Sequence, residues 1–148
     1  MNYEGMIVSN RIFIDTAPFI YLIENHPNHY SKVSKFITDE YATNEASLVT
    51  STITLAEFFV KPKLHSDTKT IHAFNTALTN LNVFVSSLSK EIAEHSAELR
   101  AKYRFLKGFD AVQLATALHN KCNLLFTNDK VFKRTGVINS ILVDDLKK

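Results

Sequence analysis

The sequence predicts an α/β fold of three layers (α/β/α), in which helices cover both faces of a central, mainly parallel sheet of about five strands. Short runs of β-branched and aromatic residues alternate along the chain with longer segments whose apolar residues recur at helical spacing. The 148 residues contain only three glycines and three prolines, and no internal repeat. We therefore expect one domain over residues 1–148, with residues 1–10 as a polar lead-in.

The first predicted strand, residues 11–14, is a β-branched and aromatic run that ends at an aspartate. Pro18 suits the first turn of the helix that follows, because its missing N–H would be unpaired there in any case. Pro27 separates this helix, which extends to about residue 24, from a second one at residues 30–43. That second segment is predicted to be helical because its apolar residues have helical period.

Residues 47–50 are the second predicted strand. A helix that begins near Thr54 follows, and we expect Pro62 to stop it. The next helix, residues 67–81, carries its apolar residues on one face. Residues 82–86 are the third predicted strand.

Ser89 is expected to cap a helix that extends to about Tyr103. Gly136 suits the end of a later short helix, because glycine readily adopts the left-handed conformation there. The remaining elements are a helix at residues 110–120, a strand at 123–127, a helix at 129–135 and a strand at 141–143.

The formal net charge of +2 favours no class of partner by itself. The single cysteine, Cys122, cannot form an internal disulfide, so the sequence fits a reducing compartment. The apolar runs are far shorter than the ~20 residues that span a bilayer, and no secretory signal precedes the first strand. We therefore expect a cytoplasmic protein without membrane contact.

Acidic residues follow several of the predicted strands. Asp15 and Asp129 lie where strands give way to helices, and Glu57 lies in the helix after the second strand. Ligands of parallel α/β sheets bind outside the carboxyl ends of the strands, so these acids are expected to face one crevice. Asp110 opens the helix that leads into the fourth strand, and it reaches this crevice only if the preceding segment brings the chain to the same edge.

Helix capping is the alternative interpretation of the same acids. Aspartate and glutamate are favoured in the first turn of a helix, where N–H groups lack partners. Thr54 and Glu57 have the spacing of a capping box. Capping after the first strand could instead be performed by Thr16. The residues considered one at a time leave both interpretations open.

Four stretches together resemble the PIN-domain ribonuclease family, and most closely the VapC toxins of type II toxin–antitoxin pairs. They occur in the order and at the spacing of that family, between residues 11 and 146, and Phe109 departs from its pattern. The stretches read Phe13-Ile14-Asp15-Thr16, Thr50-Ser51-Thr52-Ile53-Thr54-Leu55-Ala56-Glu57, Asp110-Ala111-Val112-Gln113-Leu114-Ala115-Thr116-Ala117 and Leu125-Phe126-Thr127-Asn128-Asp129-Lys130-Val131-Phe132.

The resemblance implies hydrolysis of RNA phosphodiester bonds, with Asp15, Glu57, Asp110 and Asp129 as the catalytic and metal-holding residues. Four clustered carboxylates repel one another, and a hard divalent cation relieves that repulsion. Mg²⁺ fits such oxygen ligands, and Mn²⁺ is expected to substitute for it. The resemblance also implies a cognate antitoxin and a homodimer, for which the helices at 30–43 and 67–81 could supply a surface.

Six residues near the acids in sequence are candidates for substrate contact. Lysines would bind phosphates without base specificity, although each is also an ordinary solvated charge. An alternative role for Asn128 is capping of the following helix. The candidates are Thr16, Lys61, Lys107, Thr127, Asn128 and Lys130.

Other enzyme and binding classes fit the sequence less well. A phosphoacceptor receiver domain groups two acids after its first strand, whereas Asp15 stands alone. The three glycines, Gly5, Gly108 and Gly136, cannot form a phosphate-binding glycine loop. Two alternatives keep the predicted fold: a catalytically inactive module that binds RNA or protein, and a nuclease that acts on DNA.

Overall fold

The computed structural model describes residues 9–147 and contains one sheet of five parallel strands. The strand order is β3-β2-β1-β4-β5, so the two strands that carry the most apolar residues lie at or next to the centre. Residues 1–8 of the predicted lead-in lie outside the described part. The strands are β1 (Arg11–Ile14), β2 (Ser47–Ser51), β3 (Phe84–Ser86), β4 (Leu124–Thr127) and β5 (Asn139–Leu142).

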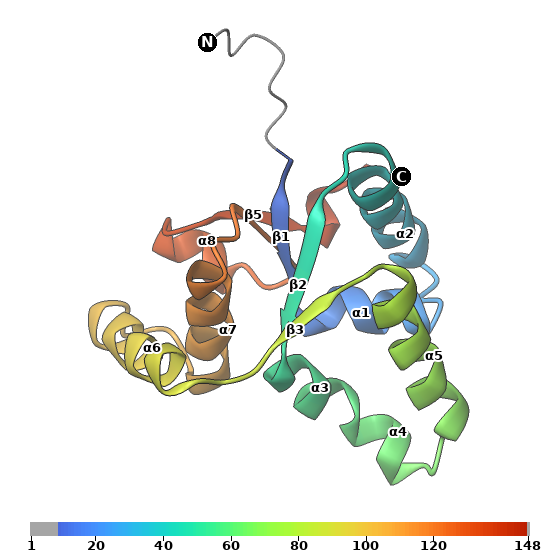
Figure 1. Cartoon of the computed structure of the whole chain (residues 1–148), viewed down its shortest axis with the longest axis horizontal. Helices are drawn as coiled ribbons and strands as arrows, with labels where there is room; N and C mark the ends of the chain where they lie inside the picture. Colours follow the sequence, from blue (N-terminus) through green and yellow to red (C-terminus); the bar gives the residue numbers. More distant parts are fainter. Residues whose placement is uncertain (1–8, 148) are drawn as a thin grey trace, which may run out of the picture.

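Helices cover both faces of this sheet, as the sequence predicts (Figure 1). One face is covered by α6 (Lys90–Lys102), α7 (Gly108–His119) and α8 (Val131–Thr135). The other face is covered by α1 (Thr16–Ile23), α2 (Tyr30–Thr38), α3 (Thr52–Phe58) and α5 (Thr68–Asn80). The short helices η1 (Asp39–Thr43), α4 (Val60–Leu64) and η2 (Val143–Asp145) complete the chain.

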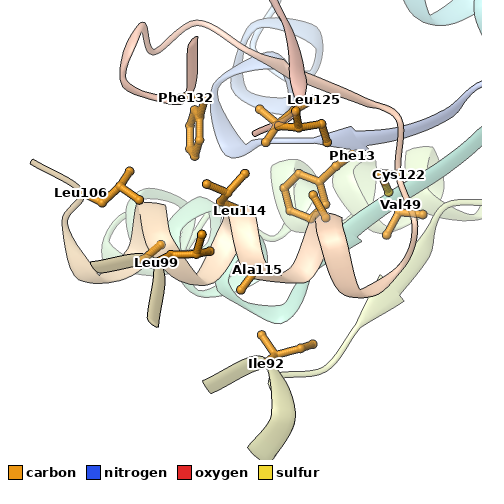
Figure 2. Close-up of a cluster of buried hydrophobic side chains, with 13 residues drawn as sticks. Phe13, Val49, Ile92, Leu99, Leu106, Leu114, Ala115, Cys122, Leu125 and Phe132 are labelled. Carbon is orange, nitrogen blue, oxygen red and sulfur yellow. The ribbon is translucent and has the colours of Figure 1, made fainter. Parts of the chain in front are cut away.

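The central strand β1 shows why both faces need a helical layer. Ile12 and Ile14 belong to one buried cluster, and Phe13 between them belongs to the other. Successive side chains of a strand point to opposite faces, so an apolar run of this kind is stable only when both faces are covered. Figure 2 shows the cluster around Phe13, in which Leu114 and Leu125 pack beside it.

The buried cluster that contains Ile12 and Ile14 also includes side chains from the two helices that were expected to supply a dimer surface. Val33 and Ile37 of α2 and Phe74 of α5 are buried in this core, so they are not available to a partner. Phe74 packs against Phe19 and Phe58, with ring centroids 5.3 and 4.3 Å apart. The apolar periodicity of these two helices therefore reflects the core.

The two ends of the sheet are built from different backbone conformations. Strands end in extended residues that precede helices, such as Asp15 (φ −74°, ψ 173°) and Ser51 (φ −121°, ψ 164°). Helices that return to strands end in the left-handed region, at Glu45, Asn82 and Lys121 (φ 49° to 57°), and at Gly136. Free helix N–H groups therefore gather at the carboxyl end of the sheet, and helix C-termini gather at the amino end.

The helix after β2 differs from the prediction in two respects. It starts at Thr52, because the Ser51 hydroxyl accepts hydrogen bonds from the N–H groups of Ile53 and Thr54. The predicted capping box at Thr54 is therefore wrong. Pro62 does not stop a helix either, because the chain already turns at Phe59. Pro62 lies in the first turn of α4, where a backbone N–H would have no hydrogen-bond partner within the helix.

The helix predicted at residues 30–43 is present but changes type along its length. Residues 30–38 form α2, and residues 39–43 continue as the π-helical η1. The wider turn is visible in the bond from the N–H of Asn44 to the carbonyl oxygen of Asp39, which are five residues apart. Within residues 9–147, no helix has the length and hydrophobicity needed to cross a membrane.

Candidate functional site

An open pocket of about 630 Å³ lies at the carboxyl ends of β1 and β4. All four acids singled out in the sequence line it, although they come from four separate segments of the chain. The residues that line this pocket, called the acidic pocket below, are Asp15, Thr16, Ala17, Ile20, Tyr21, Glu57, Asp110, Thr127, Asn128, Asp129 and Lys130.

Asp15 occupies the capping position of α1, yet its side chain makes no capping hydrogen bond. Its two carboxylate oxygens instead accept hydrogen bonds from the Thr127 hydroxyl (2.8 Å) and the Gln113 side-chain amide (3.2 Å). Burial raises the pKa of Asp15, and these hydrogen bonds partly oppose that rise, while the nearby Glu57 carboxylate adds to it. The capping interpretation therefore fails for Asp15, and its oxygens are held at the pocket.

Glu57 lies on α3 and reaches the pocket as an exposed side chain. One of its oxygens accepts a hydrogen bond of 2.7 Å from the Thr16 hydroxyl. Because α3 is capped by Ser51, Glu57 has no capping partner in Thr54, whose hydroxyl is buried against Thr50 and Gln113. The Thr16 hydroxyl at the start of α1 thus holds the Glu57 side chain at the acidic pocket.

Asp110 joins the other acids because α7 begins at the carboxyl edge of the sheet. In the parallel sheet β3 also ends at this edge, and residues 87–107, which contain α6, connect it to the start of α7. Burial raises the pKa of Asp110 to about 6, with further contributions from the carboxylates of Asp129, Asp15 and Glu57. The other three carboxylates are therefore close enough to Asp110 to disfavour its charged form.

The Asp129 side chain binds the first N–H group of α8 and also lines the pocket. One of its carboxylate oxygens accepts a hydrogen bond of 3.0 Å from the N–H of Val131, at the start of α8. Its own N–H donates to the Thr127 hydroxyl at 3.0 Å, and that hydroxyl donates to Asp15. Thr127 thereby connects two of the acids directly, and the capping interpretation of Asp129 is compatible with a functional one.

The six candidates for substrate contact divide into three groups. The Thr16 and Thr127 hydroxyls are buried and bind Glu57 and Asp15, so they hold the acids in place. Lys130 and Asn128 line the pocket. Lys107 lies near enough to Asp110 to oppose the rise in its pKa, whereas Lys61 lies outside the lining and pairs with Glu24 at 3.3 Å.

Asn128 does not cap the helix that follows it. Its side-chain oxygen accepts a hydrogen bond of 3.0 Å from the N–H of Asp144, and its amide nitrogen donates to the Tyr21 hydroxyl at 3.1 Å. The acids at the C-terminus also have partners: Asp144 lies 3.5 Å from His29, and Asp145 lies 3.0 Å from Lys133. Both side chains remain largely exposed, at 59% and 60%.

Gln113 and Tyr21 were not predicted as parts of the site. Gln113 is 1% exposed and connects Asp15 with Ser51 and Thr54 through its side-chain amide. A signal for it existed, because it lies one helical turn after Asp110 in a helix of otherwise mostly apolar residues. Tyr21 lines the pocket from α1, and an aromatic residue in an apolar helix gave no comparable signal.

The donor set of the pocket suits a hydrated hard cation. Among residues 9–147, no group of three or more His, Cys, Asp or Glu side chains is arranged so that it could hold a metal ion. Mg²⁺ commonly keeps several waters and binds through one or two carboxylates, so it does not require such a cage. Burial raises the pKa of Asp110 and the neighbouring carboxylates raise it further; a bound cation would relieve that repulsion.

Comparison with known proteins agrees with the fold. A family model described as "PIN domain" matches residues 12–138. No protein of curated function gives a significant match.

Three solved structures illustrate the similarity. A toxin–antitoxin complex from Klebsiella pneumoniae is 25% identical with a TM-score of 0.64, covering 89% of this chain and 97% of that one. VapBC2 from Rickettsia felis, bound to a promoter DNA fragment, is 18% identical with a TM-score of 0.69, covering 88% and 97%. VapC20 of Mycobacterium tuberculosis, described as a Sarcin-Ricin loop cleaving toxin, is 19% identical with a TM-score of 0.65, covering 84% and 95%.

Proposed function

Because the chain belongs to the PIN-domain family, we propose that it is a metal-dependent endoribonuclease and the toxin of a toxin–antitoxin pair. PIN domains of VapC toxins are nucleases. The main support is the acidic pocket itself, where four carboxylates from distant segments share one opening. Burial raises the pKa of Asp110 there to about 6, and the other three carboxylates add to the rise. A purely structural role would leave this repulsion without a benefit.

In this proposal Asp15, Glu57, Asp110 and Asp129 are the catalytic residues and hold the divalent cation, Mg²⁺ or Mn²⁺. When bound, the cation supplies neutralisation of phosphate charge and a water of lowered pKa. Asp15 and Asp110 are the best placed to hold it, because they are the two acids whose charged forms burial disfavours most clearly. Thr127 and Gln113 orient Asp15, and Thr16 orients Glu57.

RNA is the favoured substrate for two reasons. One structural relative is described as cleaving the Sarcin-Ricin loop, which is RNA. The four acids of the pocket also account for four of the 15 acidic residues, so the rest of the chain is more basic than the net charge of +2 indicates. Lys130 in the pocket and Lys107 beside Asp110 suit contact with backbone phosphates.

The toxin role implies a protein partner. Two of the compared structures are toxin–antitoxin complexes, from Rickettsia felis and Klebsiella pneumoniae. The side chains of Val60 and Leu64 on α4 are 64% and 77% exposed, and they are suitable contacts for an antitoxin or for a second copy in a homodimer. A cellular RNA substrate fits a cytoplasmic location, which is part of the proposal.

Cleavage of labelled RNA tests the enzymatic proposal. The purified protein should cleave single-stranded or structured RNA with Mg²⁺ or Mn²⁺, leave 5′-phosphate ends, and stop when EDTA is added. A DNA of the same sequence, tested in parallel, should remain intact. Equal cleavage of the DNA would change the substrate class, and activity that persists in EDTA would reject the metal assignment.

Growth after induced expression tests the toxin role. Expression of the chain alone should slow growth, and Asp15→Asn or Asp110→Asn should relieve the inhibition at equal protein levels. Co-expression of the protein encoded beside it should also restore growth. Equal toxicity of the wild type and both variants would reject a nuclease toxin.

A further inference from the structure

The loop between β4 and α8, which carries Asp129, is held from two sides by Asn128. The side-chain oxygen of Asn128 accepts a hydrogen bond from the N–H of Asp144 in η2, at 3.0 Å. Its amide nitrogen donates to the Tyr21 hydroxyl of α1, at 3.1 Å. Because a backbone N–H can only donate, the Asn128 oxygen must face Asp144, and this determines that the nitrogen faces Tyr21.

The Tyr21 hydroxyl is itself held by a packed aromatic cluster. The Tyr21 ring lies 4.5 Å from the ring of His29 and 5.0 Å from that of His26, measured between centroids. The two histidine rings stack on each other at 4.6 Å, with an angle of 15° between their planes. Such packing restricts the rotation of the Tyr21 ring, so its hydroxyl is a rigid acceptor.

The far side of the network is also anchored. His29, which packs against Tyr21, lies 3.5 Å from the carboxylate of Asp144, whose N–H binds Asn128. The contacts therefore form a closed ring of four residues from α1, the α1–α2 connection, the β4–α8 loop and η2. Thr127 and Asp129, on either side of Asn128, bind Asp15 and the start of α8.

From this geometry we propose that Asn128 and Tyr21 are positioning residues that hold Asp129 at the acidic pocket, and that Asn128 does not act by contacting RNA. This inference rests on the proposed function. Both hydrogen-bonding groups of the Asn128 side chain are used within the protein, which leaves neither free for a base or a phosphate. Residues that orient metal ligands typically contribute about 10- to 100-fold to metal affinity or activity when removed.

Single-atom and side-chain deletions in the full-length chain test the proposal. Tyr21→Phe removes only the acceptor hydroxyl and keeps the ring, Asn128→Ala removes both hydrogen bonds, and the double variant combines them. Tyr41→Phe is the matched control, because Tyr41 lines a pocket at the opposite end of the sheet. The measurements are kcat and KM for labelled RNA, Mn²⁺ binding by calorimetry, and thermal unfolding.

Asn128→Ala is expected to lower kcat or weaken Mn²⁺ binding about 10- to 100-fold, with little change in KM. Tyr21→Phe should shift the same quantities in the same direction. The double variant should be no worse than Asn128→Ala alone, because Asn128→Ala already removes the hydrogen bond between Asn128 and Tyr21. The Tyr41→Phe protein should match the wild type, and Tyr21→Phe should unfold at nearly the wild-type temperature.

Several outcomes would overturn the inference. If Asn128→Ala raises KM while Mn²⁺ binding and the Tyr21→Phe protein are unchanged, Asn128 contacts RNA directly. If Tyr21→Phe and Asn128→Ala both behave like Tyr41→Phe while the wild type cleaves RNA, the network has no role and the proposed function stands. A wild-type protein that neither binds Mn²⁺ nor cleaves RNA would reject the proposed function together with the inference.

Discussion

Both ends of the parallel sheet open into pockets of nearly equal size, but among residues 9–147 only the carboxyl end gathers a cluster of acidic groups. The pocket at the amino end has a volume of about 650 Å³, and the acidic pocket at the carboxyl end has about 630 Å³. The charged residues that line the amino-end pocket are Arg11 and Glu45, whereas the carboxyl end gathers four acids. The volume of a pocket therefore does not distinguish the candidate site from the other end of the sheet, whereas the chemical groups that line the pocket do.

The direction of the chain explains the difference. At the carboxyl end, strands lead into helices, and unpaired N–H groups with the positive end of the helix dipole favour acids and phosphates. At the amino end, helices lead into strands through left-handed residues such as Glu45 and Lys121. There the Arg11 side chain donates to the carbonyl oxygen of Asn120 at the end of α7, so its charge serves the fold.

The largest expected effect is on catalysis. Asp15→Asn and Asp110→Asn should each lower RNA cleavage by about 100-fold or more, since each removes a charge that the chemistry requires. Glu45→Gln makes the same chemical change at the amino-end pocket and should leave the rate within about twofold of the wild type. Initial rates of cleavage measure this, and a folded Asp110→Asn protein with full activity would contradict the assignment.

Metal binding should stabilise the protein through one end of the sheet only. At a Mn²⁺ concentration of about 100 times Kd, linkage predicts about 2.7 kcal/mol of additional stability for the wild type. Asp110→Asn should lose most of this gain, and Glu45→Gln should keep it. Chemical unfolding with and without Mn²⁺ provides the measurement. An equal gain in all three proteins would place the cation elsewhere.

In the absence of metal, burial of Asp110 and repulsion from its neighbouring carboxylates should make the stability depend on pH. The pKa of Asp110 is raised to about 6 in the fold, so folding favours its protonated form, and this contribution is lost as pH rises from about 4 through 6. Allowing for solvent screening, Asp110→Asn should be more stable than the wild type by about 1–2 kcal/mol at pH 7.5.

The advantage of Asp110→Asn should shrink as the pH is lowered through 6 and approach zero below about 4, where the wild-type carboxyl becomes protonated in both the folded and the unfolded state. Unfolding in EDTA across this pH range tests the sign as well as the size. Asp15 should respond in the same direction, because burial raises its pKa too. A constant difference at every pH would show that folding does not raise the pKa of Asp110.

The smallest expected effect concerns the amino end. Lys121 has a φ of 57°, a conformation that costs a non-glycine residue free energy. Lys121→Gly should raise the stability by about 0.5 kcal/mol, since the relief of strain slightly exceeds the entropy that glycine adds to the unfolded chain. Lys121→Ala is the control, because it removes the charge and keeps the strain. RNA cleavage should not change in either variant.

The sequence alone predicted the order of strands and helices because these elements depend on local periodicity. The apolar run of β1 and the helical spacing of residues 30–43 and 67–81 are properties of neighbouring residues. The predicted helix end at Pro62 and the predicted helix cap at Thr54 were wrong, because turns of one or two residues decide these boundaries. The four acids were singled out because the four short stretches that carry them together resemble the PIN-domain family, whereas each acid alone could have been a helix cap.

Only the tertiary structure determined how those acids are held. Gln113 binds Asp15 across 98 residues of chain, and Asn128 binds Tyr21 across 107. Such contacts depend on how strands order themselves in the sheet and on which edge α7 begins, and no local pattern contains that information. The types of residue at the site were thus determined by the sequence, whereas their mutual repulsion and their supporting hydrogen bonds arose when packing brought distant segments together.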